Sequence, residues 1–257
     1  MKHARATAWV SLACASCLGA AVHVRAGAAA AADPRETLVL ANRILAMEGL
    51  IGPFGHVSAR LGPTRFLIAR DEDHAGAQAE AADLVELDTS LTTDDVRRQG
   101  LYSEVFIHSA AYKAHPEVNA VVHTHSPYAI ALGTLAVPDG RVLPTTNPGA
   151  NLGNFIPVFS GVGLIQTPEQ GQAVTAVLQA QNGVLLRGHG AVVIGATIEQ
   201  AVLRAIYLEF EARTQLVSRA AGGPRFYQTF ESDLFKATGA IDHPWHYYLE
   251  KLRRQPN

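Results

Sequence analysis

The stretch AVVHTHSPYA, residues 120–129, joins an apolar run to a Ser-Pro pair, with two histidines between them. The run 120–122 predicts a buried strand, and Ser126-Pro127 predicts the N-cap and first turn of a helix. Side chains two residues apart on a strand point to the same face, so His123 and His125 can aim both imidazoles at one point. Two convergent neutral imidazoles suit a divalent metal, although two solvated histidines at a strand end would have the same spacing.

Helices and strands are interspersed on both sides of this stretch. Many of the connections are too short for the crossovers of a purely parallel sheet, which favours an antiparallel or mixed one. No internal repeat or low-complexity linker divides residues 33–257, so we expect one α/β domain there. The expected helices are 34–50, 103–116, 126–135, 167–181 and 197–220, and the expected strands lie within 56–69, 84–88, 119–125 and a hairpin at 183–195.

The N-terminal segment has a different composition. Lys2, His3 and Arg5 precede an uncharged run of small and apolar residues over 6–22. A positive start, a short apolar centre and small residues further on predict a secretory signal peptide within 1–32, and hence a periplasmic or secreted protein. The run is shorter than the roughly 20 residues of a membrane-spanning helix, so we expect no stable membrane span in the mature form.

Charge and cysteine content narrow the functional classes further. The formal net charge of −2 gives no basic surface, which argues against a nucleic-acid partner. Both cysteines, Cys14 and Cys17, lie in the predicted signal peptide, so the mature chain would hold none. A metal site would then have to use histidines and carboxylates.

Two further positions extend the histidine pair into a possible catalytic centre. Glu104 begins a predicted helix, and His189 lies between Gly188 and Gly190. Three imidazoles can form the protein part of an open catalytic metal site, with positions left for water or substrate. A neighbouring carboxylate can serve as acid or base, or as a displaceable ligand.

At these residues the chain resembles the class II aldolase/adducin family, over roughly residues 36–220. SEVFIHSAAYKAHPEVNAVVHTHSPYAIAL (103–132) and LLRGHGAVVIGATIEQAV (185–202) resemble its signature. The resemblance implies that His123, His125 and His189 bind a divalent metal, usually zinc, and that Glu104 is the catalytic acid/base. It also implies a three-layer αβα sandwich around a mostly antiparallel central sheet, and a homotetramer with active sites between subunits.

The chain departs from the sugar-phosphate aldolases of that family at their phosphate site. A Gly-Asn pair becomes Gly55-His56, and a Thr/Ser-Gly turn becomes IARDEDH (68–74), whose acidic residues would repel a phosphate. We therefore expect a non-phosphorylated substrate. Ser103 matches a phosphate-contacting serine of the family and would, with His56, bind a substrate carboxylate. Tyr247 is a candidate proton donor to the pocket of a neighbouring subunit.

One branch of the family is more similar. FGHVSAR (54–60) and HPWHYYLEKL (243–252) resemble decarboxylases acting on products of the 2-hydroxy-3-carboxymuconate semialdehyde type. This implies a lyase that breaks a C–C bond through a metal-bound enolate, decarboxylating a 2-oxo-3-carboxylate. An aldolase releasing an aldehyde from a hydroxy acid or sugar would use the same enolate. A non-catalytic interaction domain, as in adducin, would have no need for all four site residues.

Overall fold

The computed structural model describes residues 33–70, 78–137, 140–228 and 241–255. The predicted signal peptide and the acidic stretch 71–73 lie outside these ranges. The helices are α1 (Pro34–Met47), α2 (Thr93–Gln99), α3 (Val105–Ala114), α4 (Pro127–Gly133), α5 (Asn147–Ala150), α6 (Pro168–Leu178), α7 (Ile198–Ala220) and α9 (Asp242–Arg253). The strands are β1 (His56–Arg60), β2 (Arg65–Ala69), β3 (Leu84–Asp88), β4 (Ala120–Thr124), β5 (Arg141–Val142), β6 (Ile156–Phe159), β7 (Gly183–Leu186) and β8 (Gly190–Gly195).

The strands form one mixed sheet in the order β3-β2-β1-β4-β8-β7-β6-β5. All pairs of neighbouring strands described are antiparallel except β6 with β7. The strand β4, which carries the first histidine, lies between β1 and β8 and is therefore central in the sheet. The expected antiparallel or mixed sheet is confirmed.

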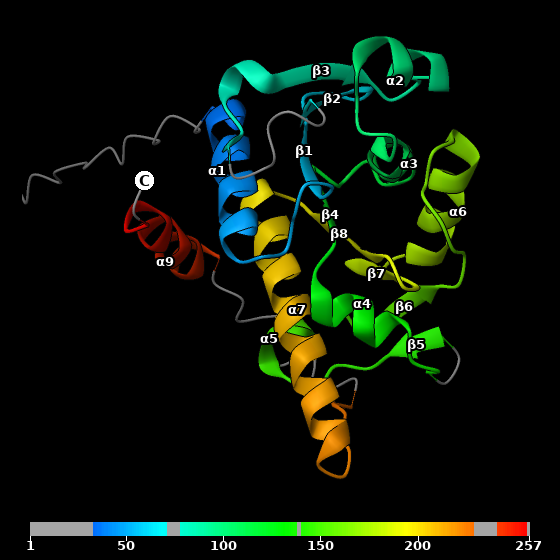
Figure 1. Cartoon of the computed structure of the whole chain (residues 1–257), viewed down its shortest axis with the longest axis vertical. Coiled ribbons are helices and arrows are strands. Elements are labelled where there is room, and N and C mark those ends of the chain that lie inside the picture. Colours follow the sequence, from blue (N-terminus) through cyan, green and yellow to red (C-terminus); the bar gives the residue numbers. More distant parts are fainter. Residues whose placement is uncertain (1–32, 71–77, 138–139, 229–240, 256–257) are drawn as a thin grey trace, which may run out of the picture. The chain divides into compact units, whose positions relative to one another are not determined.

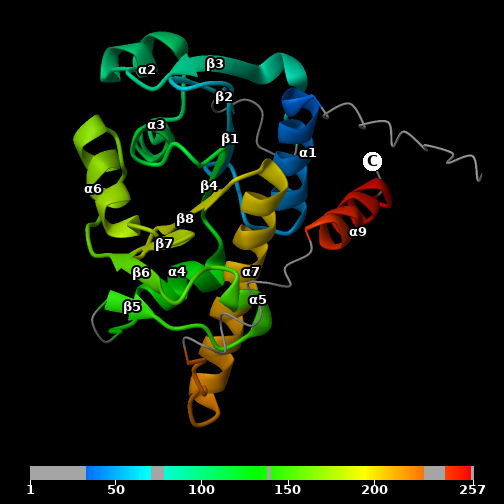
Figure 2. The same cartoon turned by 180° about the vertical axis from the view of Figure 1, so that it is seen from behind.

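Alternating side chains of the strands enter two separate hydrophobic clusters. On β4, Ala120 and Val122 join the cluster packed by α1, α4 and α7, whereas Val121 joins the cluster packed by α3 and α6. The alternation follows from the two-residue repeat of a strand, which places successive side chains on opposite faces. Helices therefore cover both faces of the sheet, as Figures 1 and 2 show. The predicted three-layer αβα sandwich is confirmed.

The ends of some elements differ from the expected ones. The helix expected over 167–181 ends at Leu178, and the next residue, Gln179, has a positive φ of 52°. Ser126 occupies the N-cap of α4 as predicted, but its side chain makes no capping hydrogen bond. Five elements were not predicted from the sequence: α2, α5, α9, β5 and β6. They are short or lie in stretches rich in proline and polar residues.

Candidate metal centre

The strand β4 positions the two histidines of the H-x-H pair. His123 is fully buried near the end of β4, and its Nδ1 donates a hydrogen bond to the Ala191 carbonyl of β8 (3.0 Å). His125 follows the strand, and its backbone N–H donates to the Leu50 carbonyl (3.0 Å). The two rings lie 4.7 Å apart between centroids, so the predicted convergence of the pair is confirmed.

His189 lies in the tight turn of the β7–β8 hairpin. Gly188 has a φ of +69°, a backbone conformation that side-chain-bearing residues rarely adopt. A Cβ atom at Gly190 would collide with the Thr124 carbonyl oxygen on β4. The two glycines thus let the hairpin turn lie against the end of β4, and the His189 ring reaches the H-x-H pair, 4.9 Å from the His125 ring.

Glu104 is the N-cap residue of α3 and is almost fully buried. Its Oε1 accepts a hydrogen bond from the backbone N–H of Ile165 (2.9 Å), which turns Oε2 towards the histidines. Burial alone would raise the pKa of Glu104, but contacts with His123 and His189 hold that pKa well below its usual range. The residue is therefore a carboxylate at neutral pH.

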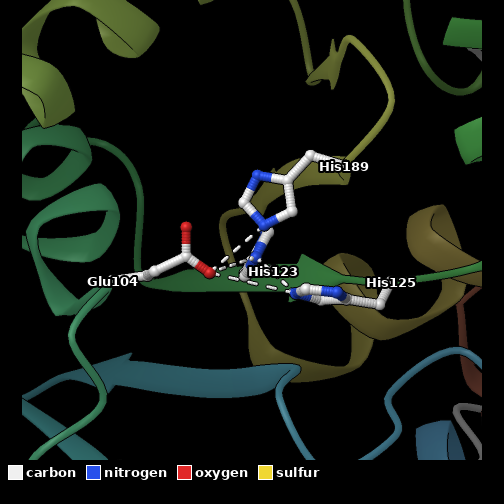
Figure 3. A group of neighbouring side chains, drawn as sticks. All are labelled: Glu104, His123, His125 and His189. Carbon is white, nitrogen blue, oxygen red and sulfur yellow. Dashed lines mark hydrogen bonds and ion pairs between the residues drawn. The ribbon is translucent and has the colours of Figure 1, made fainter. Parts of the chain in front are cut away.

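The four side chains converge on one point (Figure 3). Glu104 Oε2 lies 3.2 Å from His123 Nε2, 3.3 Å from His189 Nε2 and 3.9 Å from His125 Nε2. Ligand atoms 2.0–2.1 Å from a tetrahedral ion lie about 3.4 Å from one another. The distances from Glu104 are close to this value, and all four ligand atoms lie within 4.8 Å of one another, so the group could hold one metal ion.

The hydrogen-bonding pattern also fits a cation. Because the Ala191 carbonyl can only accept, His123 carries its proton on Nδ1 and its Nε2 presents a lone pair. That lone pair faces the Glu104 carboxylate and lies 3.0 Å from His125 Nε2. Among the described residues, His189 Nε2 is buried without a hydrogen-bond partner. A divalent ion would satisfy these electron-rich atoms together.

Protonation is consistent with this assignment. Burial, followed by the neighbouring His123 and His189, lowers the pKa of His125 to about 4. A neutral imidazole at physiological pH keeps a lone pair available for a metal. The donor set of three imidazoles and one carboxylate is one that zinc and several other divalent metals accept.

A cleft of about 470 Å³ opens beside the cluster. Both residues predicted to bind a substrate carboxylate, His56 and Ser103, line it together with Glu104 and His125. His56 lies on β1 directly opposite His123 of β4. Phe54 and Leu164, which were not predicted from the sequence, also line the cleft and are largely exposed. An apolar residue in a loop gives no sequence signal of its own.

The remaining candidate, Tyr247, and a further histidine, His108, lie in different places. His108, on α3, is fully buried and hydrogen-bonded to His56 and Ser58. Tyr247 is on α9, which packs against α1 and α7 on the opposite face of the sheet from α3, and it is 59% exposed. The structure does not bring Tyr247 to the cluster. Its role in a neighbouring subunit's pocket stays a prediction.

Comparison with known proteins agrees with the fold. Residues 36–216 match the family described as the Class II Aldolase and Adducin N-terminal domain. A 3,4-dihydroxyphthalate decarboxylase from Arthrobacter keyseri is 33% identical over 75% of this chain and 81% of the relative, and one from Rhodococcus jostii is 30% identical over 74% and 82%. The crystal structure of an aldolase II superfamily protein from Pseudomonas syringae superimposes with a TM-score of 0.71, at 25% identity, over 86% of this chain and 92% of that one.

The chain therefore belongs to the class II aldolase/adducin family, and its relatives include decarboxylases. With the four-residue site intact, it is a lyase of that family with a candidate divalent-metal centre. Within the described residues, no helix is both long and apolar enough to span a bilayer.

Proposed function

We propose that the protein decarboxylates a non-phosphorylated carboxylic acid whose departing carboxylate is attached next to an oxygen-bearing carbon. A 2-oxo-3-carboxylate has this arrangement. An aromatic acid with a hydroxyl group beside its carboxylate has it too, because its keto tautomer is a β-keto acid. The 3,4-dihydroxyphthalate named for the two decarboxylase relatives is such an acid.

One observation carries the proposal: His56, at the position where the family resemblance implies an asparagine, lines the cleft with Ser103 beside the metal centre. An imidazole N–H and a hydroxyl can both hold a planar carboxylate. The site thus offers contacts for a carboxylate next to the reacting atoms. The acidic residues of IARDEDH, at the other position of the family phosphate site, argue against a dianionic phosphate.

The residues of the site can be given distinct tasks. A divalent metal held by His123, His125 and His189 would stabilise the negative charge that develops on the substrate oxygen as the C–C bond breaks. Glu104 Oε2, already ionised, takes the proton of the substrate hydroxyl as the substrate binds. Glu104 then hands the same proton to the carbon that carries the departing carboxylate. The C–C bond breaks, its electron pair moves into the ring and out to the oxygen, and CO2 leaves.

We propose zinc as the metal, because three imidazoles leaving open positions are typical of catalytic zinc sites. Protein purified from cells supplied equally with zinc, manganese and iron should contain close to one zinc per chain. Manganese or iron at that stoichiometry would replace zinc in the proposal.

The experiment that tests the reaction offers the zinc-loaded protein two substrates separately. With 3,4-dihydroxyphthalate we expect release of CO2 and formation of a dihydroxybenzoate, and with a ketose 1-phosphate no release of aldehyde. A sample stripped of metal by a chelator is the control. Aldehyde release without CO2 would make the protein an aldolase and overturn the proposal.

A further inference from the structure

A chain of buried hydrogen bonds runs behind His56, away from the cleft. His56 Nδ1 lies 2.7 Å from His108 Nε2, and His108 Nδ1 lies 2.6 Å from the Ser58 hydroxyl. The Ser58 hydroxyl lies 2.7 Å from the Tyr112 hydroxyl. All four side chains are buried, and they come from only two elements, β1 and α3. At the open end of this chain, His56 Nε2 has no hydrogen-bond partner among the described residues.

Burial favours the neutral form of each titratable member. Among the described residues no carboxylate is hydrogen-bonded to the ring of His56 or of His108, so burial keeps both imidazoles neutral. It also raises the pKa of Tyr112, so the phenol keeps its proton. The Ser58 hydroxyl could accept from both neighbours, but its own proton would then have no acceptor paired with it among the described residues. With every proton satisfied, each link joins one donor to one acceptor and the protons of the whole chain run in a single direction.

Only one direction of proton donation gives the buried Tyr112 hydroxyl an acceptor for its proton. If Tyr112 donates to Ser58, then Ser58 donates to His108 Nδ1 and His108 Nε2–H donates to His56 Nδ1. The proton of His56 is then on Nε2, the ring nitrogen that has no partner among the described residues, and the His56 side chain lines the cleft. In the reverse direction Ser58 donates to the Tyr112 oxygen, and no other acceptor within the described part of the chain is paired with the phenol O–H. An unsatisfied buried donor is costly, so the first direction is favoured.

We propose that Tyr112, Ser58 and His108 act as positioning residues that fix His56 in the Nε2–H tautomer, so that His56 donates a hydrogen bond to the substrate carboxylate that is retained in the product. This inference rests on the proposed function, since it takes the substrate to be a carboxylic acid. It gives a buried, uncharged histidine the donor role that an asparagine amide can fill in the phosphate-binding relatives. Hydrogen bonds within the protein, without any contribution from the substrate, thus determine which ring nitrogen of His56 carries the proton.

The first test needs no substrate. Nitrogen-15 NMR of the zinc-loaded full-length chain distinguishes a protonated ring nitrogen from a bare one, and His56→Asn identifies the His56 signals. We expect His56 to carry its proton on Nε2 and His108 to carry its proton on Nε2 as well. A proton on Nδ1 of His56 would overturn the proposal, whether or not the protein decarboxylates anything.

The second test breaks the chain without touching the cleft. Ser58→Ala removes the group that orients His108, and Ser109→Ala is the matched control, because Ser109 is a buried serine of α3 that bonds to the Phe106 carbonyl. The probes are 3,4-dihydroxybenzoate, which has a carboxylate, and catechol, which has none. Their binding to the zinc-loaded variants is measured by calorimetry.

We expect Ser58→Ala to weaken binding of 3,4-dihydroxybenzoate about tenfold or more, the usual effect of losing a hydrogen bond to a charged group. Catechol binding should change less than about twofold, because catechol has no carboxylate to lose a hydrogen bond. A larger change in catechol binding would indicate that the variant has damaged the local structure. Ser109→Ala should change neither. Equal weakening of both probes, or of neither, would overturn the proposal. Failure to release CO2 would instead count against the proposed reaction.

Discussion

At the scale of single residues, backbone groups of other elements aim the side chains of the metal centre. The Ala191 carbonyl fixes the tautomer of His123, and the Ile165 N–H fixes which oxygen of Glu104 faces the histidines. The side chains themselves could be predicted from the sequence, because the H-x-H, G-H-G and helix-start positions each have a residue signature. Their backbone partners could not, because any residue type supplies a carbonyl or an N–H.

His189→Ala should abolish stoichiometric metal binding. His189 supplies one of three imidazoles, and its buried Nε2 lies 3.3 Å from Glu104 Oε2 without a hydrogen bond among the described residues. Since loss of groups that merely orient a ligand already costs 10–100-fold, we expect metal affinity to fall by more than about 100-fold. Competition with a chromophoric chelator measures this, with His243→Ala on the exposed face of α9 as the control. Full metal content in His189→Ala would remove this residue from the centre.

Glu104→Gln separates metal binding from proton transfer. The amide keeps the size of the side chain and can still accept from the Ile165 N–H, but it cannot take a proton. The three histidines should retain the metal, while turnover falls by about 100-fold or more. Metal analysis and CO2 release on the same sample check both parts. Near-normal turnover would exclude Glu104 from the mechanism, and loss of metal would make it an essential ligand.

At the scale of elements, two carboxylates of α7 hold the segments that follow the H-x-H pair. Glu209 accepts from the backbone N–H groups of Tyr128 and Ala129, and so caps α4 in place of Ser126. Glu211, fully buried, accepts from Thr145 and Thr146. The helix itself could be predicted from the sequence. The role of its acidic residues could not, because their partners are about 65 to 80 residues distant along the chain and only the fold brings them together.

Glu211→Gln should destabilise the protein strongly. Its carboxylate accepts from the backbone N–H and the hydroxyl of both threonines and from Gln215 Nε2, so an amide NH2 would face donors. Leaving such buried groups unsatisfied costs about 3 kcal/mol of unfolding free energy. Urea denaturation measures the change. Glu250→Gln, on an exposed ion pair within α9, is the control and should change stability by less than about 0.5 kcal/mol.

At the scale of the whole molecule, the layered architecture could be predicted but the full sheet could not. Apolar alternation and turn residues predicted the strands from β3 to β7 in the order of the sheet. The strands β5 and β6 were not predicted, because β5 has only two residues and β6 has four, one of which is Pro157. Such short strands at or next to the edge of a sheet depend on their neighbours more than on their own pattern.

The family resemblance predicts a homotetramer. Light scattering of the zinc-loaded protein during gel filtration should therefore give about four times the mass of one chain, as closed symmetric assemblies of identical subunits are common. Tyr247→Phe should leave that mass unchanged while lowering turnover, if the partner subunit's pocket receives this hydroxyl. A monomer with full activity would contradict both expectations.

The last prediction concerns the N-terminal segment and the cell compartment. We propose that residues 1–32 direct export and are removed, because a positive start and a short apolar run are typical of signal peptides. Both hydrophobic clusters are built from residues 38–252, so the chain from residue 33 should fold without the segment. We expect the truncated protein to match the longer chain in metal content and to unfold at the same temperature within about 1 °C, below the roughly 2–4 °C that a change of 1 kcal/mol causes in a domain of this size. Protein recovered from the periplasm should begin between residues 26 and 33. An insoluble truncated chain, or a mature protein that retains Met1, would show that the segment has another role.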